Sequence, residues 1–211
     1  MAQGDAAGAL VEYRAARATI ERAIAIDPTN VHPQSTLGSI GERTGIVLLA
    51  MGDLAGATAE FEMCGQIWAE LSARDPSNLE HQRARTLISN KLGDVRMKAD
   101  DPRGALVAYR EALEIRARLV AKDPTNAARR RDLFYSHYKI AKAHRAVPDR
   151  AQTIASFRAA LEVAAVTRAA HPDSDKFAQD EAETRGELAA ELRAVGDHAV
   201  QRRADGAAGH A

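Results

Sequence analysis

The sequence predicts an all-α chain of long helix hairpins, and three observations lead to this fold class. Aromatic residues make up only 4% of the chain, whereas Ala, the strongest helix former, is abundant. Val and Ile are scattered and never alternate with polar residues over the length of a strand. The turn residues Asp27, Asp75 and Asp123, each followed by Pro, recur 48 residues apart.

Two series of turn residues divide the chain into helices. The first series is Asp27-Pro28, Asp75-Pro76, Asp123-Pro124 and His171-Pro172. The second falls midway, at Gly4-Asp5, Gly52-Asp53, Asp100-Asp101, Pro148-Asp149 and Gly196-Asp197. Pro cannot continue a helix, and Asp, Asn, Ser or Thr beside it can cap the next one. Gly followed by Asp supplies a terminator and then an N-cap. The turns therefore predict about eight helices, over 6–26, 31–51, 53–74, 79–99, 103–122, 127–147, 149–170 and 176–195.

The turn and helix residues together resemble the tetratricopeptide repeat. Gly52-Asp53-Leu54-Ala55-Gly56-Ala57, followed by Phe61, Cys64 and Asp75-Pro76, is similar to the second helix of that repeat, and Lys91–Val95 is similar to part of the first. The usual repeat has about 34 residues, so each helix here is longer by about two turns at roughly 3.6 residues per turn. The chain is most similar to bacterial arrays of such long helices. The resemblance implies a right-handed superhelical solenoid of antiparallel helix hairpins.

The resemblance also fixes where the array begins and ends. Residues 1–197 form a single repeat array that starts mid-repeat, because Gly4-Asp5 corresponds to the turn inside a repeat. The apolar residues of 6–26 then lack a preceding helix to cover them, which has three explanations. The chain is a piece of a longer array, its true start lies upstream, or this helix pairs with another copy as a homo-oligomer. At the other end, 176–195 is acidic, as a capping helix should be, and 198–211 is expected to be flexible or disordered.

Arrays of this kind bind partner proteins in a concave groove, and the resemblance transfers that role to two helices. The expected groove residues are Arg83, Leu87, Asn90, Asp94, Met97 and Lys98 in the first helix, and Arg131, Tyr135, Tyr138, Lys142 and Arg145 in the second. Because both helices are basic, they suit an acidic peptide or a terminal carboxylate held by charge-assisted hydrogen bonds. The alternative is that these Arg and Lys side chains only solvate an exposed helix face.

Composition and motifs exclude several other classes of function. A formal net charge of +0 disfavours binding to nucleic acid. No secretory signal and no apolar stretch long enough to span a membrane occur, so we expect a cytoplasmic protein without a membrane partner. Neither a nucleophile motif nor a metal-ligand spacing is found, which predicts a protein that is not an enzyme and has no metal or cofactor.

Three further features are interpreted as packing. Cys64 replaces the Ala of other repeats, which favours a small buried residue over a nucleophile. The glycines at 38, 41 and 45 indicate either close helix packing or a weak helix. Trp68 is either an anchor at the groove rim or a space filler, and the sequence alone leaves both open.

The sequence as a whole predicts a protein–protein interaction module. It would act as a scaffold, adaptor or sensor that binds a peptide or partner protein, with an acidic peptide as the favoured ligand. Two alternatives remain. The chain is a self-assembly element that oligomerises through its uncapped N-terminal helix, or it is a fragment of a larger bacterial signalling or effector protein.

Overall fold

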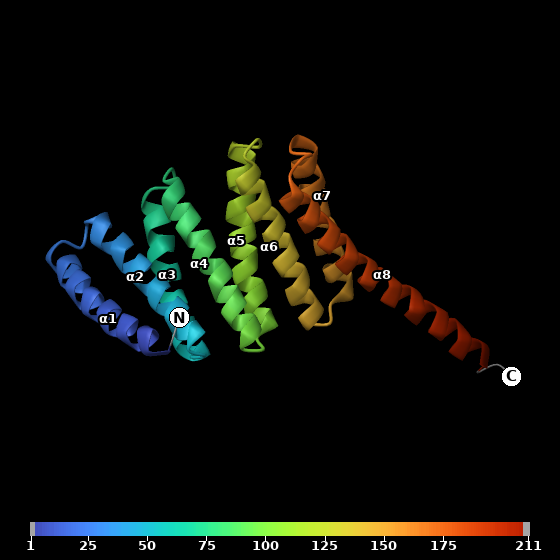
Figure 1. The fold of residues 1–211 in the computed structure, drawn as a ribbon, viewed down its shortest axis with the longest axis horizontal. Coiled ribbons are helices and arrows are strands. Elements are labelled where there is room, and N and C mark those ends of the chain that lie inside the picture. Colours follow the sequence, from blue (N-terminus) through green and yellow to red (C-terminus); the bar gives the residue numbers. More distant parts are fainter. Residues whose placement is uncertain (1–2, 209–211) are drawn as a thin grey trace. The chain divides into compact units, whose positions relative to one another are not determined.

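The computed structural model describes residues 3–208 of the chain and the side chains of residues 6–196. Eight α-helices, and no strand, run along these described residues (Figure 1). Their bounds are α1 Gln3–Ile26, α2 Val31–Ala50, α3 Leu54–Arg74, α4 Leu79–Lys98, α5 Pro102–Lys122, α6 Ala127–Ala146, α7 Arg150–Ala170 and α8 Asp175–Ala208. The predicted all-α class is confirmed.

The predicted bounds of α2 to α7 are correct to within one residue at each end. The predicted end of the last helix at 195 is wrong, because α8 continues to Ala208. Gly196 does not interrupt it, and the strong helix formers Ala and Arg that follow favour continuation. The side chains of the predicted flexible tail, 198–211, lie outside the described residues, and its flexibility stays a prediction.

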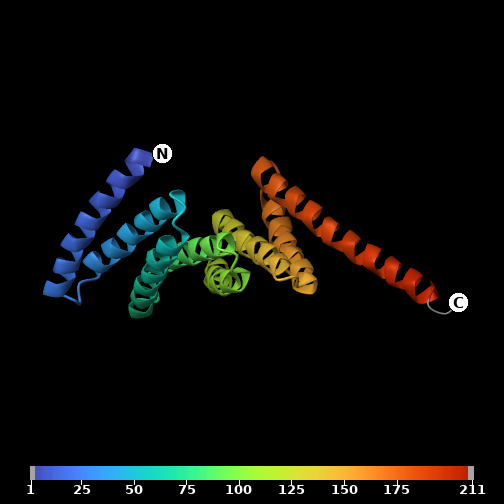
Figure 2. The same ribbon diagram turned by 90° about the horizontal axis from the view of Figure 1, so that it is seen from below.

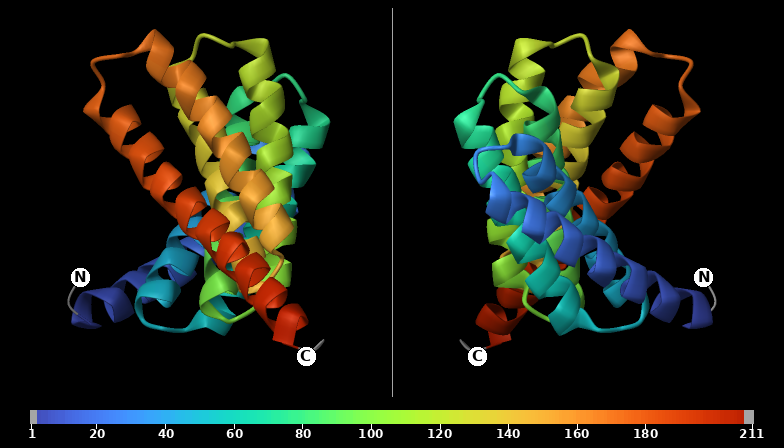
Figure 3. Two further views of the ribbon diagram at one scale, coloured as in Figure 1. Left: turned by 90° about the vertical axis from the view of Figure 1, so that its right-hand side faces the viewer. Right: turned by 90° about the vertical axis from the view of Figure 1, so that its left-hand side faces the viewer.

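The chain divides into two compact units, residues 1–115 and 116–211, so that α5 begins in the first and ends in the second. In the first unit α1 packs on α2, and α3 packs on both α2 and α4 (Figure 2). In the second unit α7 packs on both α6 and α8, and Figure 3 shows α8 running back from the loop that follows α7. The predicted antiparallel hairpins are therefore present in each unit, and a single continuous array over 1–197 stays a prediction.

The turns use the chemistry that their residues predict. Asn30 is the N-cap of α2, and its side chain accepts a hydrogen bond from the backbone N–H of His32 at 3.0 Å. At the end of α2, Gly52 adopts a φ of 83°, the left-handed conformation that glycine tolerates best. Asp53 then caps α3 by accepting from the backbone N–H of Gly56 at 2.8 Å.

In the first unit the core lies on α3, where Phe61, Cys64 and Leu71 are completely buried. The facing side of α2 is made of glycine, which lets the two helices approach closely. A Cβ atom built on Gly45 would lie 2.6 Å from Cε1 of Phe61, and one on Gly38 would lie 2.8 Å from Cε2 of Trp68. The α2 glycines therefore serve close packing, one of the two explanations that the sequence leaves open.

The second unit builds the corresponding contact with the large and small residues exchanged. Phe134 on α6 is 3% exposed and packs against Ala160 and Ala164 of α7. Phe134 corresponds to Gly38, and Ala164 corresponds to Trp68, each two intervals of the turn pattern earlier in the chain. The ring therefore comes from α3 in the first unit and from α6 in the second.

The close approach of α2 to α3 makes a testable prediction for Gly45→Ala. The added methyl group would collide with the buried ring of Phe61, so we expect the protein to lose about 1–3 kcal/mol of stability. Gly8→Ala is the matched control, because Gly8 lies in helix α1 with nothing within 4 Å of its added Cβ. That control should gain about 0.5–1 kcal/mol. Urea unfolding measures both, and a stabilised Gly45→Ala variant would contradict the packing.

Candidate functional site

The basic face of α6 is covered by acidic side chains of α8. Nε of Arg131 donates to Oδ2 of Asp180 at 2.7 Å, and the hydroxyl of Tyr135 donates to Oδ1 of Asp180 at 2.9 Å. One turn further along, the hydroxyl of Tyr138 donates to Oε1 of Glu183 at 2.7 Å. These contacts form the first half of a continuous series that we call the α6–α8 ladder.

The second half of the α6–α8 ladder centres on Glu187. Its carboxylate lies 3.0 Å from Nζ of Lys142 and 2.8 Å from Nη1 of Arg145. Nε of Arg145 donates in addition to Glu191 at 2.6 Å. Single ion pairs at a surface stabilise a protein by about 0–1 kcal/mol, and a network of shared partners is the arrangement in which they count most. The ladder therefore fixes α8 against α6 through polar contacts.

The structure brings together the five groove residues predicted on this helix and gives them carboxylates of the same chain as partners. The predicted chemistry, an acidic group held by Arg, Lys and Tyr, is present within the chain, and the binding of a separate partner there stays a prediction. The sequence predicts that the acidic residues of α8 form a polar cap at the end of the array. These acidic residues follow their α6 partners by 42 to 49 positions, close to the 48-residue interval of the turns, and this spacing is the signal in the sequence that points to the pairing.

The groove residues predicted on α4 do not form one surface. Arg83 lines a cavity, and Leu87 beside it is 41% exposed. Asn90 is buried and donates from Nδ2 to the backbone oxygen of Thr86, while Asp94 accepts a hydrogen bond from Tyr109 at 2.6 Å. The remaining two predicted residues, Met97 and Lys98, are half-buried and exposed respectively.

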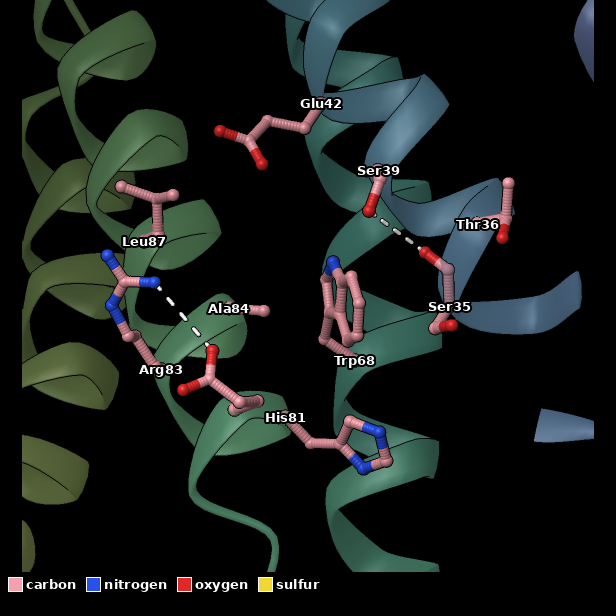
Figure 4. Close-up of a pocket in the computed structure, with 10 residues that line it drawn as sticks. Ser35, Thr36, Ser39, Glu42, Trp68, His81, Arg83, Ala84 and Leu87 are labelled. Atoms are coloured by element: carbon pink, nitrogen blue, oxygen red, sulfur yellow. Dashed lines mark hydrogen bonds and ion pairs between the residues drawn. The ribbon is translucent and has the colours of Figure 1, made fainter. Parts of the chain in front are cut away.

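The first unit contains an open cavity of about 460 Å³ between α2 and α4, with α3 behind it (Figure 4). We call it the α2–α4 cavity. From α2 it is lined by Ser35, Thr36, Ser39 and Glu42, from α3 by Trp68, and from α4 by Glu80, His81, Arg83, Ala84 and Leu87. Among these residues, the sequence predicts a binding role for Arg83 and Leu87 and leaves the role of Trp68 open. It assigns no such role to the others.

Trp68 forms the aromatic wall of the α2–α4 cavity. Its side chain is 7% exposed, and its Nε1 has no hydrogen-bond partner among the residues that the structure describes. Gly38 leaves the space that the indole occupies, and the ring of His81 lies 5.9 Å away, tilted by 44°. Of the two roles that the sequence leaves open, Trp68 fills space in the α2–α3 contact, and because it also lines the cavity its role as an anchor for a partner stays a prediction.

The corresponding place in the second unit is nearly closed. A cavity of only about 10 Å³ remains there, lined by Arg131, Phe134, Ala164, Thr167, Phe177 and Asp180. Arg131 and Asp180 meet across this gap, whereas the first unit has the small residues Ser35 and Ala84 at those two positions. Exchanging a long ion pair for two short side chains therefore accounts for the open space between α2 and α4.

The single cysteine of the sequence, Cys64, is buried. Burial, with a smaller contribution from nearby Glu60, raises the pKa of the Cys64 thiol to about 12, so this thiol is protonated at neutral pH. Among the described residues, no three His, Cys, Asp or Glu side chains gather in a way that could hold a metal ion. None of the described helices combines the length and the apolar character needed to cross a membrane.

Comparisons with known proteins return similarity of structure alone. No family model matches the sequence, and no curated protein matches it either. Among solved structures, the crystal structure of MamA is 13% identical over 94% of this chain and 98% of that one, with a TM-score of 0.38. BtubC (BKLC) from P. vanneervenii is 15% identical over 90% and 92% of the two chains, with a TM-score of 0.46. The DHF119 filament is 10% identical over 92% and 98%, with a TM-score of 0.41.

The α6–α8 ladder predicts a specific loss of stability in acid. Partial burial acts to raise the pKa of Glu187, but hydrogen bonds from Arg145 and Lys142 outweigh it and lower that pKa below the ordinary 4.5. A carboxylate with a lowered pKa in the folded state stabilises the fold above its unfolded pKa, and this stability is lost as the pH falls through the folded value. The unfolding temperature of the wild type should therefore fall as the pH drops below about 4.5. We expect this fall to be smaller in Glu187→Gln.

The matched control is Glu70→Gln, which removes the same charge from an exposed position of α3. Thermal unfolding of both variants is followed from about pH 7 to about pH 3, the range in which a Glu187 carboxylate with a lowered pKa loses its charge. An acid slope that Glu187→Gln leaves as steep as that of the wild type would contradict the ladder as the source of the pH dependence.

Proposed function

We propose that this chain is a protein-interaction module whose ligand-binding surface is the α2–α4 cavity. The observation that carries the proposal is that this cavity is open at about 460 Å³, while the corresponding place in the second unit is closed by Arg131 and Asp180. The corresponding position is thus filled by an ion pair in the second unit and is left open in the first. The free copy is available to side chains of another protein.

The size and lining of the α2–α4 cavity suit part of a peptide. Ligand pockets commonly enclose about 300–1,000 Å³ and combine an apolar wall with a few polar groups. Here Trp68 and Leu87 provide the apolar surface, and Ser39 and Glu42 provide polar groups on the opposite wall. Aromatic side chains in such pockets supply much of the binding energy of protein interfaces.

The resemblance to tetratricopeptide repeats supports a binding role over an enzymatic one. In that family, partner segments lie along the same helices that α2 and α4 represent, and the long-helix bacterial arrays are the expected relatives. On this proposal the chain serves as a scaffold, adaptor or sensor in the cytoplasm, either alone or as part of a larger signalling or effector protein.

A second candidate function is binding of an acidic peptide on the basic face of α6. The α6–α8 ladder favours it, because Arg131, Tyr135 and Lys142 there already hold carboxylates. A separate acidic peptide would have to displace the acidic side chains of α8 before it could make the same contacts. The α2–α4 cavity needs no such displacement, which is why we rank it first.

A third candidate function is self-assembly through α1. Val11 is 63% exposed and Ile26 is 85% exposed, so the outer face of this helix presents apolar side chains to solvent. A second copy packed against α1 would bury them, which favours association.

Selection of peptides from a displayed random library tests the first candidate. We expect the wild type to enrich peptides that lose binding in Ala84→Phe, because the added ring fills the α2–α4 cavity. Blocking the central pocket of an interface typically costs about 2 kcal/mol, which corresponds to about a 30-fold loss of affinity. Ala59→Phe, at an exposed position on α3, is the matched control and should leave binding unchanged.

The same selection separates the second candidate from the first. Enriched acidic peptides that bind Ala84→Phe normally, but not a variant combining Arg131→Glu with Lys142→Glu, would move the ligand site to α6. If no enriched peptide depends on either surface, both binding proposals are wrong.

Light scattering tests the third candidate. If α1 mediates self-association, the wild type should show a mass above that of one chain, and Val11→Glu combined with Ile26→Glu should return it to a monomer. Val107→Glu is the control, since Val107 is 65% exposed on α5 and lies away from α1 in the sequence. A wild-type protein that is monomeric at high concentration would remove this candidate.

A further inference from the structure

We propose that the α2–α4 cavity recognises its peptide through a basic side chain, Lys or Arg. The inference rests on the proposed function and adds the chemical class of the ligand. It is opposite in sign to the acidic peptide that the sequence favoured.

The hydroxyl groups on the α2 wall offer acceptors and no free donors. Oγ of Ser35 donates to the backbone oxygen of His32 at 2.9 Å, and Oγ of Ser39 donates to the backbone oxygen of Ser35 at 3.0 Å. Thr36 also donates to His32, at 2.9 Å. Each hydroxyl has one proton, and these contacts use it. The oxygen lone pairs remain, and they can accept from a ligand.

The carboxylates of the cavity add further acceptors. Glu42 reaches from α2 toward α4 in Figure 4, and among the described residues it has neither an ion-pair nor a hydrogen-bond partner. Glu80 pairs with Arg83 at 3.7 Å, but the two side chains are 82% and 77% exposed. Such exposed pairs are weak, so Glu80 is also able to accept from a ligand.

The nitrogen atoms of His81 do not supply the missing donors. Nδ1 lies 3.3 Å from the backbone oxygen of Leu71, and Nε2 lies 3.5 Å from Nδ2 of Asn78. A neutral ring that carries its proton on Nδ1 satisfies both contacts, because Nδ1 then donates and Nε2 accepts. Arg83 is therefore the cationic side chain among the described lining residues, and its guanidinium pairs with the carboxylate of Glu80.

A basic side chain supplies what this cavity lacks. The ammonium of Lys has three donors and the guanidinium of Arg has five, and neither has an acceptor. The indole of Trp68 adds a ring over which a cation is attracted. The Nε1 edge of that ring, unpartnered among the described residues, faces the end of the cavity where Ser39 and Glu42 lie (Figure 4). Because Nε1 itself is buried, the ligand would contact the ring of Trp68 and not this nitrogen.

The second unit shows the same chemistry completed within the chain. The guanidinium of Arg131 lies 4.7 Å from the centre of the Tyr135 ring and donates to Asp180. A cation, an aromatic ring and a carboxylate therefore meet at this place of the repeat. In the first unit the positions of Arg131, Tyr135 and Asp180 are held by Ser35, Ser39 and Ala84, and a ring and a carboxylate come instead from other positions, Trp68 and Glu42. The ligand would bring the missing cation.

Four capped peptides that differ only in one central residue test the proposal. That residue is Arg, Lys, Gln or Glu in an otherwise Ala sequence, and each peptide is titrated into the full chain. Trp68 is the one Trp of the sequence, so its emission reports directly on the cavity, and calorimetry gives the affinity. We expect the Arg and Lys peptides to bind about tenfold more tightly than the Gln peptide. The Glu peptide should bind most weakly.

Two variants with opposite expected effects identify the residues. Glu42→Gln should weaken binding of the Arg peptide about tenfold, because it removes the unpaired carboxylate. Arg83→Gln should strengthen binding, since it removes the competing cation and frees Glu80. The controls are Glu70→Gln and Arg103→Gln, which change the net charge by the same amount at exposed positions outside the cavity. Circular dichroism confirms that each variant folds.

The outcomes separate this inference from the proposed function. A Gln or Glu peptide that binds as tightly as the Arg peptide overturns the basic ligand class. So does a Glu42→Gln variant that behaves like Glu70→Gln. Library peptides that still depend on Ala84 would then leave the binding function standing. If none of the four peptides binds, the inference is wrong, and the library selection decides independently whether the cavity binds any peptide.

Discussion

Two helices that pack on the same third helix leave a gap between them, and the side chains facing that gap determine what the surface can do. Helices α2 and α4 share α3 in this way, and α6 and α8 share α7. The backbone arrangement sets the gap, but it does not fill it. Long charged and aromatic side chains close the gap between α6 and α8, whereas short hydroxyl and methyl groups leave the gap between α2 and α4 open.

The space beneath each gap holds a limited volume of side chains. One ring fits at the crossing of the paired helices, and it is carried by Trp68 in the first unit and by Phe134 in the second. The partner position must then be small, as Gly38 and Ala164 are. Because protein interiors are closely packed, two rings would not fit and two small residues would leave a void.

The sequence was sufficient for the features that depend on neighbours in the chain. Asn30, Gly52 and Asp53 end and begin helices through contacts a few residues away, so the bounds of six helices were predicted to within one residue. The basic residues of α6 are expected on one face because the resemblance to tetratricopeptide repeats assigns them to the groove. Their carboxylate partners lie on a different helix, and no local pattern distinguishes Asp180 from a solvated residue. The role of Trp68 was undecidable for a similar reason, since it depends on a small residue at Gly38 and another at Ala84.

The exchange of Gly38 and Trp68 for Phe134 and Ala164 separates two sets of positions with different freedom to vary. Residues at the turns and beneath the gap are constrained by geometry, and changes there must be compensated in pairs. Residues that face the gap and belong to no core cluster, such as Ser35 and Ser39, are free of this paired constraint. The chemistry of the surface at one helix hairpin can therefore change while the packing that holds the hairpin together stays unchanged.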